Sequence, residues 1–336
     1  MFTLDDHDPH EVGRKLGHDL FTHRAVFNLT FSVTSSGVPQ AQGADAAVLE
    51  GMQQARAENR ARKPTDRYTR KWLQLRLNAY RRQRVVDDAV TPELLQRIDV
   101  THCPVTRTEL THSTRRLTDW SVDRLNNDGA YVPNNLAVMS AAANRAKGQL
   151  NFEQVLARAQ AGDETAVQPG GLQRCEWLRL ASLMLGPCFV SRPHLVPMIP
   201  LAADLPAYAV RPAVQQVQQV FTHGASSAAG KNALIKYFLP TSATEGSAWR
   251  LRAFADSLHQ GSKRLEHRCD VWLQPAVFDA FTEWRAALDD DAWALAAEIS
   301  RGLSGATRVS PSRLGAWHLA TRGHALCAGQ RGIRAT

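Results

Sequence analysis

The sequence contains few cysteines and no closely spaced cysteine pair. Five occur in 336 residues, and none belongs to a Cys-x-x-Cys motif: Cys103, Cys175, Cys188, Cys269 and Cys327. Disulfide-stabilised small proteins and cysteine-rich zinc sites both depend on closer spacing. We therefore expect neither of them, and we expect a reducing, cytoplasmic setting.

Long apolar runs are missing as well. The first residues, MFTLDDHDPH, have neither the basic start nor the apolar centre of a secretion signal. The most apolar stretches are WLRLASLMLGPCFV and LVPMIPLAADLPAYAV. Both are shorter than the roughly 18 apolar residues that a membrane-spanning helix needs. We expect a soluble protein without a membrane partner.

Acidic residues are outnumbered by basic ones. The chain has 32 Asp and Glu against 40 Lys and Arg, which gives a net charge of +8 and a pI near 9.5. Such an excess favours a polyanionic partner. It is concentrated in residues 51–90, which hold eleven Lys and Arg against four Asp and Glu.

Within this basic range, YTRKWLQLRLNAYRRQRVV places apolar residues at helical spacing among arginines. The pattern predicts one or two basic amphipathic helices, and it allows two interpretations. The basic side chains form a solvated face over a packed apolar stripe, or they contact the phosphates of a nucleic acid. In the second case the contacts come from Arg70, Lys71, Arg81 and Arg82.

Other patterns predict a mostly helical α+β protein in three parts. Residues 27–34 alternate apolar and polar side chains, which predicts a half-buried strand. Thr91 and Pro92 have the residue types that begin a short helix. We expect an N-terminal region over residues 1–98 and a central unit over residues 99–165.

The last part of the chain, residues 172–336, predicts an all-α domain. Apolar residues recur there at helical spacing, and Pro, Gly and Ser clusters separate the stretches: 172–185, 212–222, 246–259, 275–288 and 291–302. No repeat period is present. The pattern gives a fold class for this domain but no function.

Residues 120–148 predict a compact unit of strand, loop, strand and helix. The strands are WSVDRL and LAVM, and turn residues in NNDG and VPNN separate them. Ser140 is a suitable N-cap for the helix AAANRAKG, and Gly148 is suited to end it. Such a unit is about the smallest that can bring the side chain of a strand residue and that of a helix residue to the same place.

This unit has the oxygen groups of a candidate metal site. Asp123 ends the first strand and Asn144 lies one turn into the helix, so both oxygens are expected to reach one cation. A single charged oxygen ligand suits Mg²⁺, or Mn²⁺, which takes further ligands from water and substrate phosphates. Lys147 shares a helical face with Asn144, and Arg145 is adjacent; both are expected to hold a phosphate. Asn135 is expected to bond loop backbone and fix its shape.

Residues 103–154 resemble the HNH endonuclease family. The resemblance rests on CPVTRTEL and on VDRL, GAYVPNNL and NRAKG in this order. It is to phage and bacterial variants that carry Asp-Arg in place of Asp-His. The resemblance implies a ββα-metal unit in which Asp123 and Asn144 bind the metal and Asn135 braces the loop. It also implies metal-dependent hydrolysis of phosphodiester bonds in DNA.

The chain departs from the family pattern at the general base. Arg124 stands where a histidine would activate water, and a guanidinium does not accept a proton. Arg124 is instead suited to clamp a phosphate or stabilise developing charge. The base is then absent, or it is a metal hydroxide, or it comes from His112 or His102. A general base contributes about 10²–10⁴-fold, so its loss predicts a slow enzyme.

The second departure concerns zinc. Many relatives hold this unit together with two cysteine pairs, whereas here Cys103 stands alone. Thr106, Ser140 and Ala143 occupy the other three positions. A structural Zn²⁺ needs about four nitrogen or sulfur ligands. We expect no structural zinc and a unit held by the packing of flanking helices.

Three functional hypotheses follow. The first is a Mg²⁺- or Mn²⁺-dependent HNH-like endonuclease that cuts DNA, or RNA, in a phage-related role. The second is a nucleic-acid-binding module that has lost catalysis, and Arg124 favours it. The third is a helical interaction protein, in which the C-terminal domain contacts a partner or a second copy.

Overall fold

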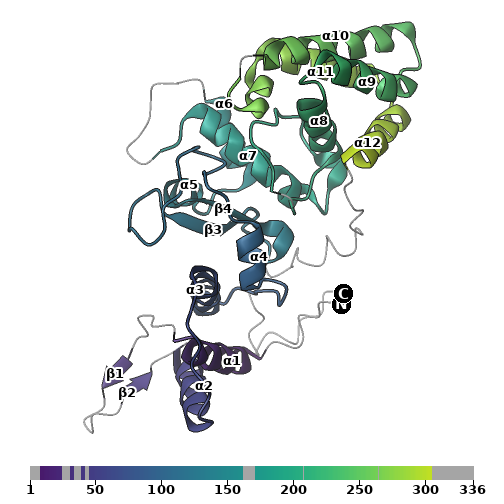
Figure 1. Ribbon diagram of the computed structural model, residues 1–336. Coiled ribbons are helices and arrows are strands. Elements are labelled where there is room, and N and C mark those ends of the chain that lie inside the picture. The colour runs from purple at the N-terminus through teal and green to yellow at the C-terminus, as the bar shows by residue number, and fades with distance from the viewer. Residues whose placement is uncertain are drawn as a thin grey trace. The chain divides into compact units, whose positions relative to one another are not determined.

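The computed structural model describes residues 8–24, 31–33, 39–41, 45–161, 171–206, 208–263 and 265–304. These residues are mostly helical, with two small two-stranded sheets, which confirms the predicted α+β class (Figure 1). They form two compact units. The N-terminal unit contains the described residues up to Asp99 together with Asn127–Leu136, and the C-terminal unit contains Val100–Asn126 and the described residues of Ala137–Gly315. No helix in the described ranges has the length and apolar character to cross a membrane.

The N-terminal unit is built from four helices and a hairpin. The helices are α1 (Pro9–Thr22), α2 (Ala46–Ala57), α3 (Arg67–Arg81) and α4 (Pro92–Arg97). The hairpin pairs β1 (Phe31–Val33) with β2 (Pro39–Ala41) in antiparallel register, Phe31 opposite Ala41. The buried core contains Leu16, Leu20, Val48, Leu73 and Leu77. The apolar stripe predicted on α3 therefore packs inward against α1 and α2.

Helices α1 and α2 approach each other closely because glycines line their contact. A Cβ atom on Gly17 would lie 1.8 Å from the carbonyl oxygen of Val48, and one on Gly51 would lie 1.9 Å from that of Arg14. Only glycine leaves room for such an approach. The contact explains why a segment with few large apolar residues still forms a stable helix pair.

Two predicted elements of this unit are present as expected. Helix α4 begins as predicted, with Pro92 at its first position and the Thr91 hydroxyl accepting from the Leu94 amide at 3.2 Å. Strand β1 lies within the strand predicted over residues 27–34, of which 27–30 and 34 lie outside the described residues. Helix α1 was not predicted, although Asp8 caps it and Pro9 is its first residue.

The predicted strand–loop–strand–helix arrangement is present, with both strands almost entirely in the C-terminal unit. Strand β3 (Trp120–Arg124) pairs with β4 (Leu136–Ser140), and α5 (Ala141–Lys147) follows directly. Helix α6 (Phe152–Gln160) starts with a capping box between Asn151 and Gln154, as its sequence predicts. The linker expected after it lies mostly outside the described residues.

The remaining described elements of this unit are helices, as predicted from apolar spacing. They are α7 (Arg174–Phe189), α8 (Ala213–Gly224), α9 (Ala228–Phe238), α10 (Glu245–Ser262), α11 (Pro275–Ala286) and α12 (Asp290–Ser304), with short 3₁₀ turns between some of them. Helix α9 was not predicted. Their core is aromatic, and Phe254 stacks on Trp284 with ring centroids 5.6 Å apart.

The central segment and the C-terminal helices share one compact unit, whereas the sequence led us to expect two. The Arg107 guanidinium donates two hydrogen bonds to the Asp270 carboxylate. Arg179 on α7 donates to the carbonyl of Val105 at 3.2 Å. These charged and polar contacts join residues that are far apart in sequence, which is why helical periodicity did not indicate them.

Candidate functional site

The candidate site lies where α5 packs on β3. Neighbouring strand residues alternate between faces, so Ser121 and Asp123 share one face of β3. Asn144 and Lys147 lie one turn apart on α5 and share a helical face. The Ser140 hydroxyl accepts from the Ala143 amide at 3.2 Å and starts the helix, which Gly148 ends at φ +47°.

Two contacts join the strand and the helix at this site. The Asn144 Nδ2 donates to the Ser121 hydroxyl at 2.6 Å. The Lys147 Nζ lies 2.9 Å from the Asp123 Oδ2 in an ion pair. The Lys147 side chain is 0% exposed and that of Asp123 is 16% exposed. Asp123 and Asn144 therefore lie on facing surfaces, but each engages a different partner.

With Lys147 in place, these residues do not fit a divalent cation. The site offers one carboxylate, and a buried ammonium already balances its charge. A metal ion bound to the same carboxylate would lie next to that ammonium, where like charges repel strongly because little water screens them. No group of three or more His, Cys, Asp or Glu side chains among the described residues offers another metal site.

Lys147 was expected to hold a phosphate, and its complete burial contradicts this expectation. The side chain is buried completely against β3. Its helical face was identified correctly, but that face turns toward Asp123 rather than toward solvent. A buried ammonium is costly unless it is paired, and the ion pair with Asp123 supplies the partner.

The predicted catalytic groups lie apart from Asp123. Arg124 is only 6% exposed, and as the next residue of β3 it projects to the opposite face. The His112 ring packs edge-on against Trp120, with centroids 5.2 Å apart. Trp120 shares the strand face of Arg124 by the same alternation. His102 is exposed, and its Nδ1 lies 3.0 Å from the Thr101 hydroxyl.

The loop between β3 and β4 is fixed by Asn135 and Tyr131. Asn135 is fully buried, and its Nδ2 donates to the carbonyl of Ala130 at 3.0 Å. The Tyr131 amide donates to the Val85 carbonyl at 3.0 Å, and the Asp87 amide donates to the Tyr131 carbonyl at 2.9 Å. The two Tyr131 bonds, which sequence patterns did not suggest, join the loop to residues 85–87 of the same unit.

Hydrogen bonds surround Cys103 and join three of the four positions at which the HNH family that the sequence resembles often carries zinc ligands. The buried Cys103 Sγ accepts from the amides of Thr106 at 3.4 Å and Ser140 at 3.2 Å. The hydroxyls of Thr106 and Ser140 lie 3.4 Å apart. Ser140 also caps α5 through the Ala143 amide. Cys103, Thr106 and Ser140 therefore contact one another, and Ala143 is joined to Ser140.

Asp119 organises an exposed basic loop beside α5. Its carboxylate accepts from the hydroxyls of Thr111 and Thr114 and from the amides of Thr114 and Arg115, at 2.6–3.1 Å. Burial alone would raise the pKa of Asp119, but hydrogen bonds from Thr114 and Thr111 outweigh it and hold the pKa well below its usual range. The loop is rigid enough to hold Arg115 at φ +61°.

This loop gives the C-terminal unit a basic surface that sequence reasoning missed. Arg115 and Arg116 are exposed, and so is Arg145 in the last turn of α5. The Ala141 amide donates to the Asp119 carbonyl at 2.7 Å, which fixes the loop to the start of α5. The adjacent arginines in HSTRRLTD were the available signal.

The predicted basic contacts of the N-terminal unit differ in their surroundings. Arg70 and Arg82 are exposed, and Lys71 is half-buried. Arg81 donates to both carboxylate oxygens of Asp45 at 3.0 and 2.7 Å, and Asp45 is almost fully buried. The hydrogen bonds to Asp45 raise the pKa of Arg81. The predicted phosphate contact of Arg81 would compete with Asp45, because the guanidinium already pairs with that carboxylate.

Comparison of the chain with protein-family models, with curated proteins and with solved structures found no match. Two features of the chain bear most directly on its function: the ion pair that neutralises Asp123, and the exposed arginines beside α5.

Proposed function

We propose that this chain binds nucleic acid through an HNH-like ββα unit, residues 120–147, in which the candidate metal site is neutralised internally. The observation that carries the proposal is the ion pair between the buried Lys147 ammonium and Asp123. It favours a binding module over a metal-dependent nuclease because the carboxylate expected to hold the metal already has a cation. The burial of Arg124 favours the same choice.

The exposed arginines supply the contacts that binding requires. Arg115, Arg116 and Arg145 belong to one unit, and Asp119 fixes the loop that carries the first two. A loop held in one conformation loses little entropy when it binds. Arginine is suited to phosphate because its planar donors pair with two oxygens at once. The proposed partner is DNA, with RNA as the alternative. Contacts to the phosphate backbone do not depend on base sequence, so no sequence preference is expected.

Metal-dependent cleavage of DNA is a second candidate, and a separate observation favours it. The Asp123 Oδ2 is buried and accepts no hydrogen bond of normal geometry within the described structure. Asn144 faces the same strand surface, through its bond to Ser121. If the Lys147 ammonium leaves Asp123, these groups fit the Mg²⁺ or Mn²⁺ site that the resemblance implies.

One set of measurements on the full chain separates these functions. Binding to a fluorescent DNA duplex, a single strand and an RNA is measured by anisotropy for wild type and for Arg115→Gln/Arg116→Gln. Arg250→Gln, at an exposed position of α10, is the matched control. We expect the double variant to bind more weakly and the control to bind like wild type. The proposal fails if no nucleic acid binds, and that result would leave the helical interaction hypothesis.

Cleavage is tested with supercoiled plasmid and Mg²⁺ or Mn²⁺. The comparison includes wild type, Asp123→Ala, Asn144→Ala and Arg124→His. We expect no nicking by wild type. If wild type nicks the plasmid and both alanine variants do not, the chain is a metal-dependent endonuclease. That result would overturn the proposal that Lys147 neutralises the candidate metal site. Nicking by Arg124→His alone would show that the arginine disables an otherwise competent site.

A further inference from the structure

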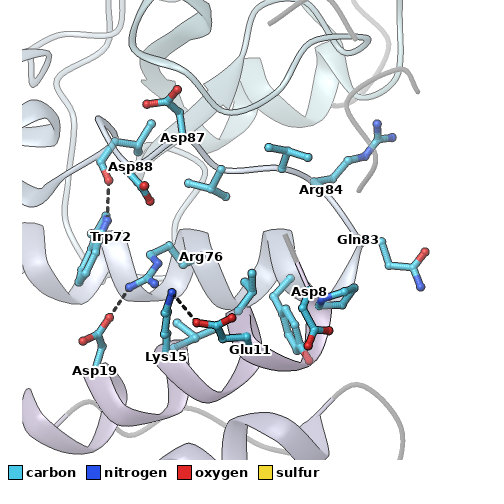
Figure 2. Close-up of a pocket in the computed structure, with 17 residues that line it drawn as sticks. Asp8, Glu11, Lys15, Asp19, Trp72, Arg76, Gln83, Arg84, Asp87 and Asp88 are labelled. Carbon is cyan, nitrogen blue, oxygen red and sulfur yellow. Dashed lines mark hydrogen bonds and ion pairs between the residues drawn. The ribbon is translucent and has the colours of Figure 1, made fainter. Parts of the chain in front are cut away.

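The N-terminal unit contains a pocket that the proposed function does not use. It has a volume of about 440 Å³ and lies between α1, α3 and residues 83–90 (Figure 2). Leu16, Val85 and Val90 on its wall are almost fully buried, and Val12, Trp72, Tyr80 and Val86 add further apolar surface. Small-molecule sites usually have volumes of about 300–1,000 Å³ and apolar walls.

The walls of the pocket are held by specific contacts. The Trp72 Nε1 donates to the Val90 carbonyl at 2.6 Å, and the Arg76 guanidinium lies 4.4 Å from the Trp72 ring centroid. Arg76 also pairs with Asp19 at 2.6 Å. Backbone bonds to Tyr131 fix Val85 and Asp87. The pocket is therefore preformed, which lowers the entropic cost of binding a ligand.

Carboxylates outnumber cations around the pocket. Its lining includes five acidic side chains and three cationic ones. Glu11 pairs with Lys15 at 2.9 Å and Asp19 pairs with Arg76. The other three, Asp8, Asp87 and Asp88, have no Lys, Arg or His nitrogen within 4 Å among the residues that the structure describes.

Two of these unpaired carboxylates, Asp88 and Asp8, lie on different sides of the pocket, whereas the Asp87 carboxylate points away from it. Figure 2 shows Asp88 extending from the upper segment toward the side where Lys15 and Arg76 lie, and Asp8 at the start of α1 below. Asp8 and Asp87 each accept one backbone hydrogen bond, from His10 at 3.0 Å and Ala89 at 2.7 Å. Asp88 is exposed and lies near enough to Lys15 to raise the pKa of that lysine, after the larger effect of Glu11.

We propose that this pocket binds a small organic cation, an amine or guanidine that carries an apolar body about the size of a phenylalkyl group. The apolar wall takes the body, and the unpaired carboxylates of Asp8 and Asp88 attract the charged end. An anion of the same shape meets the surplus negative charge. A bare metal ion lacks the apolar body, and the described residues offer it no cluster of three ligands here. The proposal goes beyond nucleic-acid binding and does not depend on it.

The test uses three probes of one shape on the full chain: 3-phenylpropylamine, 3-phenylpropan-1-ol and 3-phenylpropanoate. Binding is measured by saturation-transfer NMR and titration calorimetry. We expect the amine to bind most tightly, the alcohol more weakly, and the carboxylate most weakly. Equal binding of amine and carboxylate, or no binding of any probe at millimolar concentration, overturns the proposal.

Variants then locate the site. Asp88→Asn should weaken amine binding by about two- to fivefold, the usual range for one partly exposed ion pair, and Asp88→Lys should weaken it further. Asp279→Asn and Asp279→Lys, at an exposed position of α11, are the matched controls and should bind the amine like wild type. Val86→Trp should fill the pocket and abolish binding of all three probes, with unchanged thermal unfolding as the check on folding. Unchanged amine affinity in Asp88→Lys overturns the proposal even if Val86→Trp fails to fold.

Discussion

Lys147 places a full positive charge at a position that water does not reach. Its side chain is 0% exposed, and the Asp123 carboxylate lies 2.9 Å from its Nζ. A buried ion pair is weak evidence for stability as a whole, but removal of one partner leaves the other charge uncompensated. We therefore expect the pair to affect both the stability of residues 120–147 and their capacity to bind a metal ion.

Replacement of Lys147 by methionine should expose this dual role. We expect Lys147→Met to lower the free energy of unfolding by about 3 kcal/mol, because the largely buried Asp123 carboxylate then lacks a counter-charge. Millimolar Mn²⁺ should restore part of the loss by supplying a cation. Urea unfolding with and without MnCl₂ measures both effects.

Two further measurements are controls for this prediction. Lys147→Met/Asp123→Asn has no unpaired charge, so it should regain most of the lost stability and should not respond to Mn²⁺. Wild type should also not respond. A Mn²⁺ response in wild type would mean that Lys147 does not block the site.

Asp119 gives a prediction for pH. Hydrogen bonds lower its folded-state pKa, so the unfolded chain takes up a proton before the folded one does. The stabilisation by Asp119 is therefore complete above the unfolded-state pKa of about 3.9 and is lost as the pH falls through the lower folded-state pKa. The stability difference between wild type and Asp119→Asn should be constant near neutral pH and shrink below about pH 4. Urea unfolding across pH 3–7 measures it, and an identical difference at every pH would contradict it. Asp279→Asn is the control.

At the scale of elements, the structure brings together Cys103, Thr106 and Ser140, three of the four positions that hold zinc in the HNH family that the sequence resembles. Cys103, Thr106 and Ser140 already contact one another, and Ala143 adjoins Ser140. Four thiolates at such positions would give tetrahedral coordination. Thr106→Cys/Ser140→Cys/Ala143→Cys should therefore bind Co²⁺ with the intense charge-transfer absorption of thiolate ligands, and Zn²⁺ should displace it.

Wild type lacks these ligands and should show no such absorption. Addition of Cys103→Ser to the triple variant should weaken Co²⁺ binding, because one of four thiolates is lost. Absence of the absorption in a folded triple variant would mean that the four positions do not converge as an HNH-like unit requires.

The glycine contact between α1 and α2 gives a second prediction at this scale. A methyl group on Gly17 meets backbone, which does not move aside easily. Gly17→Ala should lower the stability of the N-terminal unit by at least the roughly 1–3 kcal/mol typical of overpacking. Gly302→Ala in α12 is the matched control, since nothing lies within 4 Å of the new methyl, and it should be neutral or stabilising because alanine favours helix. Thermal unfolding of both variants decides the outcome.

Sequence patterns predicted the elements of the site better than its contacts. Ser140 and Gly148 marked the bounds of α5 because capping is local in sequence. The same patterns placed Asn144 and Lys147 on one face but gave no sign that Lys147 would meet Asp123. The direction in which a short helix turns its face depends on its packing against β3, and that packing is a tertiary property. Helix α1 was missed because glycines, which lower helix propensity, supply its packing surface.

On the scale of the whole molecule, the two compact units are not continuous stretches of the sequence. Residues Asn127–Leu136 belong to the N-terminal unit; they include most of the loop after β3 and the first residue of β4. The other residues of both strands belong to the C-terminal unit. Tyr131 makes the backbone bonds that fasten this loop to Val85 and Asp87. The chain therefore passes between the two units more than once, which the predicted ranges 1–98, 99–165 and 172–336 did not indicate.

The net charge of +8 belongs to the whole molecule, but few residues should carry its effect on binding. For duplex DNA, the logarithm of the binding constant falls with the logarithm of salt concentration by about 0.9 for each phosphate neutralised. If Arg115 and Arg116 each contact one phosphate, Arg115→Gln/Arg116→Gln should reduce this slope by roughly 1.8. Arg250→Gln removes the same kind of charge from α10 and should leave the slope unchanged. An equal loss of slope in both variants would show that diffuse charge, rather than the loop fixed by Asp119, holds the nucleic acid.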